Sequence, residues 1–375
     1  MAPAARAVGL EDSEALETAL RTPRQLAWRR FRKNRLAGAS AVVVALFYLM
    51  ALFAAFLSPY HHDEKFTKLR FAPPQRVHFF DEDGRLSRPY TYALKQELDL
   101  ETFALTYQEQ EDTKYYVQFF VRGEPYRWLG IIPMQRHLFG VEEGGSIFLF
   151  GTDTLGRDLL SRILIGSQVS LSVPLVGTLV TIIIGTILGI ASGYFGRMID
   201  HALQRFIEVL ISFPRVPLWL AFSAAIPATW PSGWVYMGIV VAISLIGWGG
   251  LARVVRGKVL AYRNEEYVLA AEGVGAGTWR IITKHLLPGS LSHIIVVATL
   301  SVPELILAES SLSFLGVGVT PPMTSWGILL QGAQSVQALL HQPWLGLPAI
   351  YIIVIVLAFN SLGDGVRDAA DPFAT

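Results

Sequence analysis

Apolar residues in this chain are gathered into long blocks instead of being spread along it. No lysine, arginine, aspartate or glutamate occurs within 163–196, 216–252 or 310–363. Each block exceeds the roughly 20 residues that a helix needs to cross a hydrocarbon core of about 30 Å. The pattern therefore predicts an all-α polytopic membrane protein.

Six transmembrane helices are expected from the apolar blocks and their flanks, over residues 36–58, 168–193, 201–226, 234–252, 290–312 and 346–363. A charged stretch at 151–165 predicts an amphipathic helix on the outer side, before the second span. The domain boundaries that follow are a cytoplasmic N-terminal segment 1–35, a first span 36–58, an inserted extracytoplasmic domain 59–150, a five-helix core 151–366 with a cytoplasmic loop 253–288, and a cytoplasmic tail 367–375.

Basic residues indicate the orientation of these helices. A cluster precedes the first span: Arg29, Arg30, Arg32, Lys33 and Arg35. A second cluster lies in the loop: Arg253, Arg256, Lys258, Arg263, Arg280 and Lys284. Because cytoplasmic loops carry the excess of lysine and arginine, both clusters are expected inside, with both termini in the cytoplasm. A basic run can also bind nucleic acid, but directly before a span it indicates orientation, and we expect no nucleic-acid partner.

The segment 59–150 differs in character from the rest. It is rich in acidic residues and has no apolar run long enough to span a membrane. Alternation at 115–121 predicts a strand. We expect a small α+β domain outside the membrane. Two interpretations stay open for it, a docking surface and an insertion without a function of its own.

The loop 253–288 is too long to be a simple connection. Glu265 and Glu266 suit a helix N-terminus, and the glycines at 273, 275 and 277 break the helix that follows. That helix carries an apolar, small-residue stretch at 268–271. Such a stretch in the cytosol is expected to bury itself against a partner. The physical pattern alone predicts a docking helix.

The same loop resembles a known family motif. Tyr267-Val268-Leu269-Ala270-Ala271, then Gly275, then His285-Leu286-Leu287-Pro288 is similar to the EAA loop of importer permeases in the ABC-transporter superfamily. The resemblance implies that Tyr267, Ala270, Ala271, Gly275, Leu287 and Pro288 belong to the loop that couples to the ATP-hydrolysing subunit. Leu269 stands where the glutamate of the motif is expected.

Further stretches resemble the dipeptide, oligopeptide and nickel permeases of that superfamily. They are the basic start at 28–34, Gly151–Asp158, Phe213-Pro214, Leu312–Gly318, Pro321-Pro322 with Ser325-Trp326-Gly327, and the tail 362–372. The resemblance covers roughly residues 24–58 and 151–372. Segment 59–150 is longer than the usual connection in these permeases, and no resemblance is assigned there.

The resemblance implies partners and a location. We expect a second homologous permease subunit, two ABC ATPase subunits, an extracytoplasmic solute-binding protein and the lipid bilayer of the bacterial inner membrane. ATP and Mg²⁺ would be bound by the ATPase subunits. The most common cargo in this class is a dipeptide or oligopeptide, while nickel and oligosaccharides use similar permeases.

The sequence also excludes several chemistries. No G-x-x-x-x-G-K-[ST] phosphate loop, H-E-x-x-H or G-x-S-x-G motif is present. Cysteine is absent, so thiol catalysis and cysteine-ligated zinc are excluded. We therefore expect no catalytic residue, no resident cofactor and no metal site, and a chain that is not an ATPase by itself. His61-His62 is interpreted as a wetted surface pair.

Carboxylates within spans are costly and therefore informative. Glu208 lies in the third span, and Glu304 and Glu309 lie in the fifth. Because Glu208 neighbours Arg205, we expect it to have a structural role. Glu309, with Phe213 and Pro214, is our candidate for the translocation path. For Glu309 the alternative is a pairing with an arginine of the second permease, or a place at the headgroups.

Two readings outside the ABC class compete with this one. A secondary transporter or channel driven by an ion gradient would need no ATPase partner, but it leaves the loop 253–288 unexplained. An intramembrane enzyme would need paired catalytic groups at one depth, and the sequence offers none.

Overall fold

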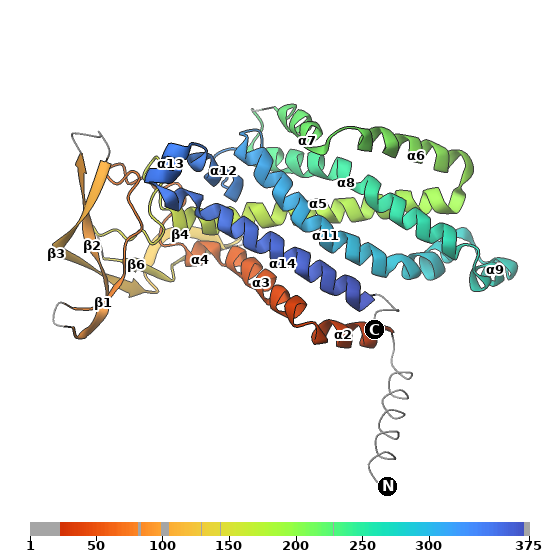
Figure 1. Ribbon diagram of the computed structural model, residues 1–375, viewed down its shortest axis with the longest axis horizontal. Coiled ribbons are helices and arrows are strands. Elements are labelled where there is room, and N and C mark those ends of the chain that lie inside the picture. Colours follow the sequence, from red (N-terminus) through yellow and green to blue (C-terminus); the bar gives the residue numbers. More distant parts are fainter. Residues whose placement is uncertain are drawn as a thin grey trace, which may run out of the picture.

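The computed structural model describes residues 23–81, 84–98, 105–128, 130–142, 144–227 and 229–370. A long helical bundle carries a group of β-strands at one end, and helix α9 lies at the other (Figure 1). The outermost parts of the predicted N-terminal segment and tail, 1–22 and 371–375, lie outside the described residues.

The helices of the bundle are mostly long. Their bounds are α2 Pro23–Lys33, α3 Arg35–Leu52, α4 Ala54–Leu57, α5 Leu159–Phe195, α6 Arg197–Ser212, α7 Arg215–Ala224, α8 Ser232–Tyr262, α9 Glu266–Gly273, α10 Thr278–Ile281, α11 Leu287–Phe314, α12 Trp326–Leu330, α13 Val336–His341 and α14 Leu347–Ala370. A π-helical turn, Ile282–Leu286, joins α10 to α11, and two 3-10 turns, Gln331–Ala333 and Pro343–Gly346, flank α13.

Five helical stretches among the described residues are long and apolar enough to cross a membrane: Arg35–Leu52, Leu159–Phe195, Ser232–Tyr262, Thr278–Phe314 and Pro343–Ala370. A sixth crossing is reached if α6 and α7 are counted as one bent span. The chain is thus a mostly helical multi-pass membrane protein, as expected. A count of six transmembrane crossings requires that the bent pair α6 and α7 be one span.

The separate outer helix predicted at 151–165 is wrong. Residues 152 and 158 form an isolated antiparallel bridge that closes a turn, and α5 then runs unbroken for 37 residues. Asp158 begins this helix, because its side chain accepts a hydrogen bond of 2.8 Å from the backbone N–H of Ser161. The charges that suggested an amphipathic helix belong mainly to the turn.

The third span, predicted at 201–226, is divided between two helices. Helices α6 and α7 meet at an angle of 90°. Phe213 has an extended backbone, with φ −85° and ψ 140°, because a residue before proline is pushed out of the helical region. Pro214 also lacks the N–H that a continuous helix would need.

The inserted segment folds from strands, not from the expected mixture of strands and helices. Its described residues contain β1 His78–Phe80, β2 Leu86–Leu98, β3 Leu105–Phe119, β4 Arg122–Trp128, β5 Ile132–Arg136 and β6 Phe139–Val141, and no helix. One sheet has the order β1-β2-β3-β6, and β4 pairs with β5 in a separate antiparallel hairpin. The predicted strand at 115–121 is the end of β3.

Helices α5 and α8 form the closest pair in the bundle, and glycines make the contact possible. Gly185, Gly189 and Gly193 recur every four residues along one face of α5. A Cβ built on Gly189 would lie 2.7 Å from the carbonyl oxygen of Ala252 and 2.8 Å from Cβ of Val255. Small residues let two helix backbones approach in this way, which supplies van der Waals contact where lipid offers no hydrophobic drive.

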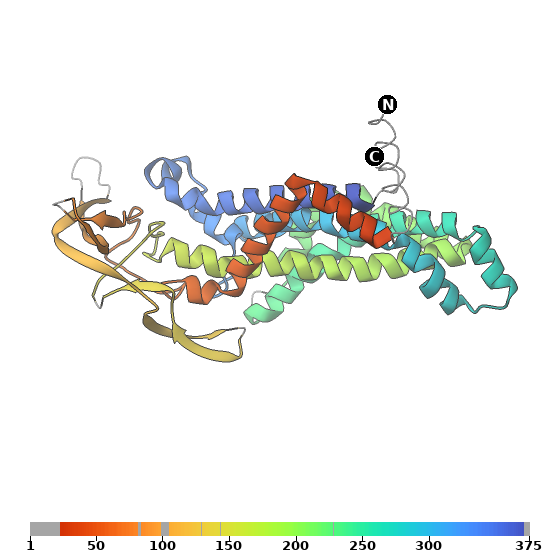
Figure 2. The same ribbon diagram turned by 90° about the horizontal axis from the view of Figure 1, so that it is seen from below.

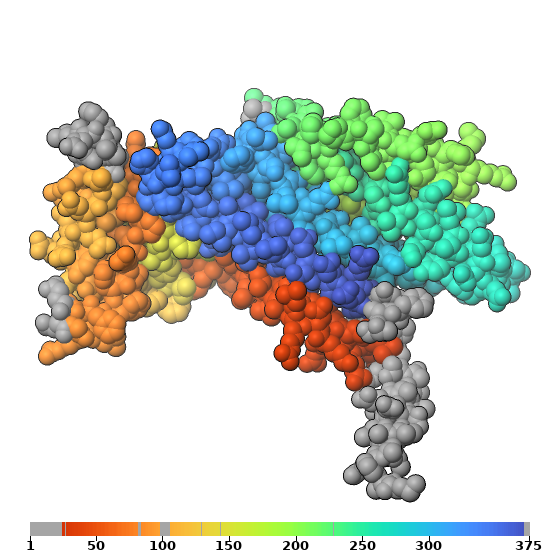
Figure 3. Space-filling view, viewed as in Figure 1, coloured from red at the N-terminus to blue at the C-terminus, as the bar shows by residue number. Residues whose placement is uncertain are grey.

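The two ends of the bundle differ in content. The strands gather at one end of the long axis, whereas α9 lies at the far end (Figures 2 and 3). Helix α2 and the end of α14 lie toward the α9 end (Figure 1). The two described chain ends and the predicted coupling loop therefore share one side of the bundle.

Replacing Gly189 with alanine is expected to destabilise the protein by about 1–3 kcal/mol, because the added methyl group overpacks the α5–α8 contact. Gly257→Ala in α8 is the matched control, since a Cβ there meets nothing within 4 Å. Thermal unfolding in detergent measures both variants. Equal midpoints for the two would contradict the contact described here.

Candidate functional site

The loop between α8 and α11 is a folded unit anchored by few side chains. Val268 of α9, Ile281 of α10 and Leu286 of the π-helical turn are buried. They pack in one apolar cluster with Val255 and Val259, near the C-terminal end of α8. The loop therefore stands on the bundle in a fixed position.

Gly275 ends α9 in a Schellman motif. The N–H of Gly275 donates to the carbonyl of Glu272 at 2.9 Å, and that of Ala276 donates to the carbonyl of Ala271 at 3.0 Å. Gly275 has φ +82°, in the left-handed region that other residues enter only with strain. This confirms the helix break that the glycines predict. The positive φ explains why a glycine stands at position 275.

The outward face of the loop is apolar. Tyr267 is 47% exposed and Leu269 50% exposed, while Ala270 is exposed and Ala271 half-buried. Two further side chains, Val274 at 87% and Trp279 at 77%, extend this face. Neither was a predicted site residue. Val274 could have been found from the sequence, because it is an apolar residue directly beside the turn glycine Gly275. An exposed apolar surface of this composition is suited to contact with another protein.

Leu287 and Pro288 connect the loop to the membrane. Leu287 packs beside the cluster that holds Val268, and Pro288 is the second residue of α11, directly after the π-helical turn Ile282–Leu286. The helical stretch Thr278–Phe314 is continuous through the π-helical turn. A displacement of the loop would therefore be passed directly into α11.

The bend at Phe213 and Pro214 is on the surface of the chain. Phe213 is 54% exposed. Next to it, Arg215 of α7 forms an ion pair with Glu304 of α11. Both partners are about half exposed on their side chains. Sequence reasoning noticed Glu304 but did not pair it, because the partner is 89 positions away along the chain.

Glu309 lies elsewhere, inside the chain. Its side chain is fully buried and accepts hydrogen bonds from Ser313 at 2.8 Å and from Ser170 of α5 at 3.2 Å. Ser310 donates a third, at 3.4 Å. Within the described residues Glu309 forms no ion pair. Arg205 and Glu208, by contrast, form an exposed ion pair in α6, at 2.9 Å.

The serines around Glu309 also hold the segment after α11. The hydroxyl of Ser170 accepts the N–H of Trp326 at 3.0 Å, and that of Ser313 accepts the N–H of Val319 at 3.2 Å. The stretches 312–318 and 325–327 are therefore brought together at this cluster. Glu309, Phe213 and Pro214 do not share one surface, and the role of Glu309 in the path stays a prediction.

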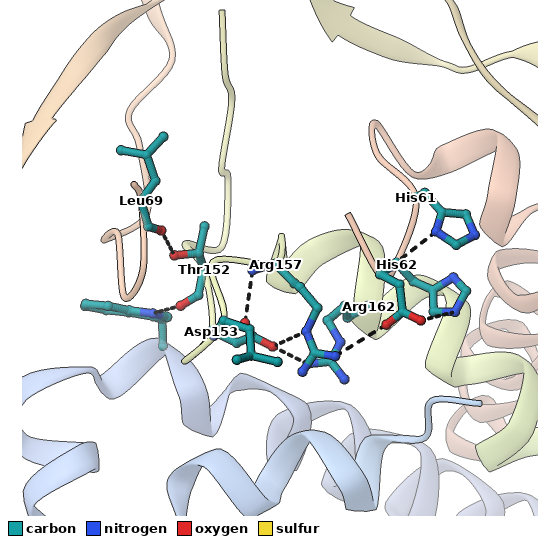
Figure 4. Close-up of polar contacts among 10 residues, drawn as sticks. His61, His62, Leu69, Thr152, Asp153, Arg157 and Arg162 are labelled. Atoms are coloured by element: carbon teal, nitrogen blue, oxygen red, sulfur yellow. Dashed lines mark hydrogen bonds and ion pairs between the residues drawn. The ribbon is translucent and has the colours of Figure 1, made fainter. Parts of the chain in front are cut away.

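The stretch Gly151–Asp158 joins the inserted segment to the core (Figure 4). The hydroxyl of Thr152 accepts the N–H of Ala72 at 2.8 Å and donates to the carbonyl of Leu69 at 2.6 Å. The indole of Trp344 donates to the carbonyl of Thr152 at 3.0 Å. Gly156, at φ +77°, leaves no room for a side chain against the backbone of Phe66.

Asp153 is the centre of the charged part of this junction (Figure 4). Its carboxylate accepts from the backbone N–H of Arg157 at 3.0 Å and from Nε of the same residue at 2.8 Å, and it also pairs with Arg162. Arg157 reaches Asp63 at 3.3 Å. Because Arg162 is buried, removing Asp153 would leave a charge without compensation.

Asp158, just before α5, has no such cation. One carboxylate oxygen caps the helix, and the other has no hydrogen-bond partner. Burial raises the pKa of Asp158 to about 7, against the lowering effect of its hydrogen bonds to Ser161. Among the described residues, no group of three histidine, aspartate or glutamate side chains is arranged to hold a metal ion.

Comparison with known proteins places this architecture in a family. Residues 185–375 match the binding-protein-dependent transport system inner membrane component, and residues 22–74 match the N-terminal TM domain of oligopeptide transport permease C. The first match covers half of the chain. The chain therefore belongs to the family of inner-membrane components of binding-protein-dependent transport systems.

Individual relatives extend the match. The chain is 33% identical over 355 residues to the dipeptide transport system permease protein DppC of Bacillus subtilis, covering 93% of this chain and 85% of that protein. It is 31% identical over 352 residues to DppC of Lactococcus lactis, covering 94% and 91%. The oligopeptide permease protein OppC of Haemophilus influenzae is 44% identical over 225 residues, covering 60% and 70%.

Replacing Glu309 with alanine is expected to lower the free energy of unfolding by about 3 kcal/mol, because buried serine hydroxyls lose their acceptor. Glu309→Gln keeps an acceptor oxygen and should cost only about 1 kcal/mol. Unfolding in detergent and solute uptake are both measured. If Glu309→Gln leaves solute uptake unchanged, the charge of Glu309 has no role in the translocation path.

The stability of the protein is expected to depend on pH through Asp158. Its pKa is raised in the folded state, so between pH 3.8 and about 7 the folded protein holds a proton that the unfolded chain loses. The free energy of unfolding therefore falls as pH rises through this window, by roughly 4 kcal/mol from this group. Asp158→Asn retains the helix cap and should remove that part of the slope. Identical slopes in the two proteins would contradict the prediction.

Proposed function

We propose that the chain is a pore-forming permease subunit of an ATP-driven ABC importer for dipeptides or oligopeptides. The observation that carries the proposal is the folded loop 263–286, with an apolar outward face on a bundle of spanning helices. A gradient-driven transporter has no use for such a face. Peptide cargo is supported by the names of the relatives, which are dipeptide and oligopeptide permeases.

Two ATPase subunits would supply the energy, with ATP and Mg²⁺ bound there and not on this chain. Closure of the ATPases would push on α9 and the turn at Gly275. The continuous helical stretch Thr278–Phe314 supports a mechanism in which that push moves α11 as a rigid body. Discrete movements of rigid helices are the usual basis of such switches.

A second, homologous permease would complete the path. The exposed bend at Phe213 and Pro214, with the Arg215–Glu304 pair beside it, is the part of this chain that we assign to the shared pore. Charged side chains half exposed at span depth require water or a polar partner, which a pore provides. Glu309 would act behind this surface by holding α5 and α11 together.

The bundle would sit in the bacterial inner membrane with α9 and both termini in the cytoplasm. The basic residues that flank α3 and α9 support this orientation. The strands would then lie outside, at the end where a solute-binding protein delivers cargo. A docking role for the inserted segment is part of this proposal. Nickel or an oligosaccharide is the alternative cargo.

The coupling role is tested with Gly275→Ala in the transporter purified from native membranes. Alanine at φ +82° is strained by about 1–2 kcal/mol, so the turn should shift. Peptide uptake per ATP hydrolysed is expected to fall about tenfold, the factor that 1.4 kcal/mol represents. Gly273→Ala is the matched control, because that glycine ends α9 without a positive φ.

Four results would contradict the proposal. Purification of the chain without any ATPase subunit, or uptake that persists without ATP and follows an ion gradient, would favour a secondary transporter. Nickel uptake with no peptide uptake would show that the cargo is nickel and not a peptide. Equal coupling in the two glycine variants would show that the turn at Gly275 does not transmit the push.

A further inference from the structure

The β4–β5 hairpin is separate from the main sheet and turns back toward the helices. Its base is the pair Arg122 and Arg136, and its last pair before the turn is Trp128 and Ile132. Figure 2 shows the hairpin folding back beside α4 instead of continuing away from the bundle. Its tip is therefore the part of the inserted segment nearest to the membrane-spanning region on that side.

Contacts with the first helix show how far the hairpin descends. Near its base, His137 Nδ1 lies 2.7 Å from the carbonyl oxygen of Ser58, and the N–H of Leu138 donates to Phe56 at 2.7 Å. Near its tip, Trp128 Nε1 donates to the carbonyl of Leu52 at 2.9 Å. The contacts thus move back six residues along the chain, from Ser58 just after α4 to Leu52 at the end of α3.

Leu52 is the last residue of α3. The apolar run continues through Phe53 and α4 to Leu57, so the tip lies beside the end of the first span, where a boundary with the lipid headgroups is expected. The ring of Trp128 stacks on Phe53 with centroids 5.7 Å apart. Tryptophan is the residue most typical of this boundary, because its ring is apolar and its N–H is polar. Here the N–H is satisfied by the helix end.

The tip itself is apolar and uncovered. Ile131 is 80% exposed, Ile132 46% and Met134 37%. The exposed Arg127 lies next to Trp128. This sequence of an arginine, a tryptophan and then isoleucines matches the change from headgroup to acyl chain in a leaflet.

The helix below the tip faces the same environment. Only 17% of the apolar window of α3 is buried, the lowest share of the five spans. Val42 and Leu46 are each 58% exposed, and Leu49 is 49% exposed. The apolar tip therefore adjoins a peripheral helix whose outward side chains suit lipid.

We propose that the tip of the β4–β5 hairpin inserts into the outer leaflet of the membrane, with Ile131 and Ile132 among the acyl chains and Arg127 at the phosphates. The occupant of this surface is phospholipid. The hairpin thereby fixes the height of the strands above the bilayer, independently of what the transporter carries.

The absence of cysteine allows a direct test. Ile131→Cys is labelled with an environment-sensitive fluorophore in the complete transporter, in nanodiscs of phosphatidylcholine and phosphatidylglycerol. Glu111→Cys, on the exposed β3 strand, is the matched control. We expect blue-shifted emission that doxyl-labelled lipids quench and aqueous iodide does not, for position 131 only.

Two outcomes would overturn the proposal. Quenching of the 131 label by iodide and not by doxyl lipid would place the tip in water. Quenching by doxyl lipid in the isolated chain that is lost in the complete transporter would show that a second subunit covers the tip. Because Ile131 is exposed, its replacement leaves the fold intact, and transport by the labelled protein verifies this.

Discussion

The close contact between α5 and α8 is the interaction on which the rest of the structure depends. It joins two helices whose ends have different contacts. The N-terminal end of α5 follows Asp158 and carries Arg162, so it holds the junction with the strands. The C-terminal end of α8 carries Val255 and Val259, on which the loop with α9 stands. A pair without glycines would separate these helices and lose the register between the two ends.

A buried polar layer completes this framework. Glu309 links α11 to α5 through Ser170, and the same serines fix the segment around Trp326. Burying a carboxylate is expensive unless its hydrogen bonds are made, and here three serines make them. The layer therefore specifies one arrangement of α5 and α11, whereas an apolar core alone would permit sliding.

The sequence predicted the membrane class, the approximate positions of the spans and the helix break at Gly275, because these depend on block hydrophobicity and on short local motifs. The coupling role of the loop stays a prediction. Sequence reasoning failed where a local pattern was overruled by its neighbours. The charges at 153–162 suggested an amphipathic helix, but Asp153 uses them in a turn. The residues around Phe213 read as one apolar run, although Pro214 bends it by 90°. The pairing of Arg215 with Glu304 depends on tertiary structure, and no local pattern contains it.

The way in which α9 is attached has a consequence for the evolution of the complex. Eight residues form this helix, and a single one, Val268, is buried against the bundle. The remaining positions can change without disturbing the packing of the spans. If α9 binds an ATPase subunit as proposed, recognition of the ATPase and recognition of the solute would be encoded in separable parts of one chain, and a permease of this form could acquire a new motor while it keeps its old cargo.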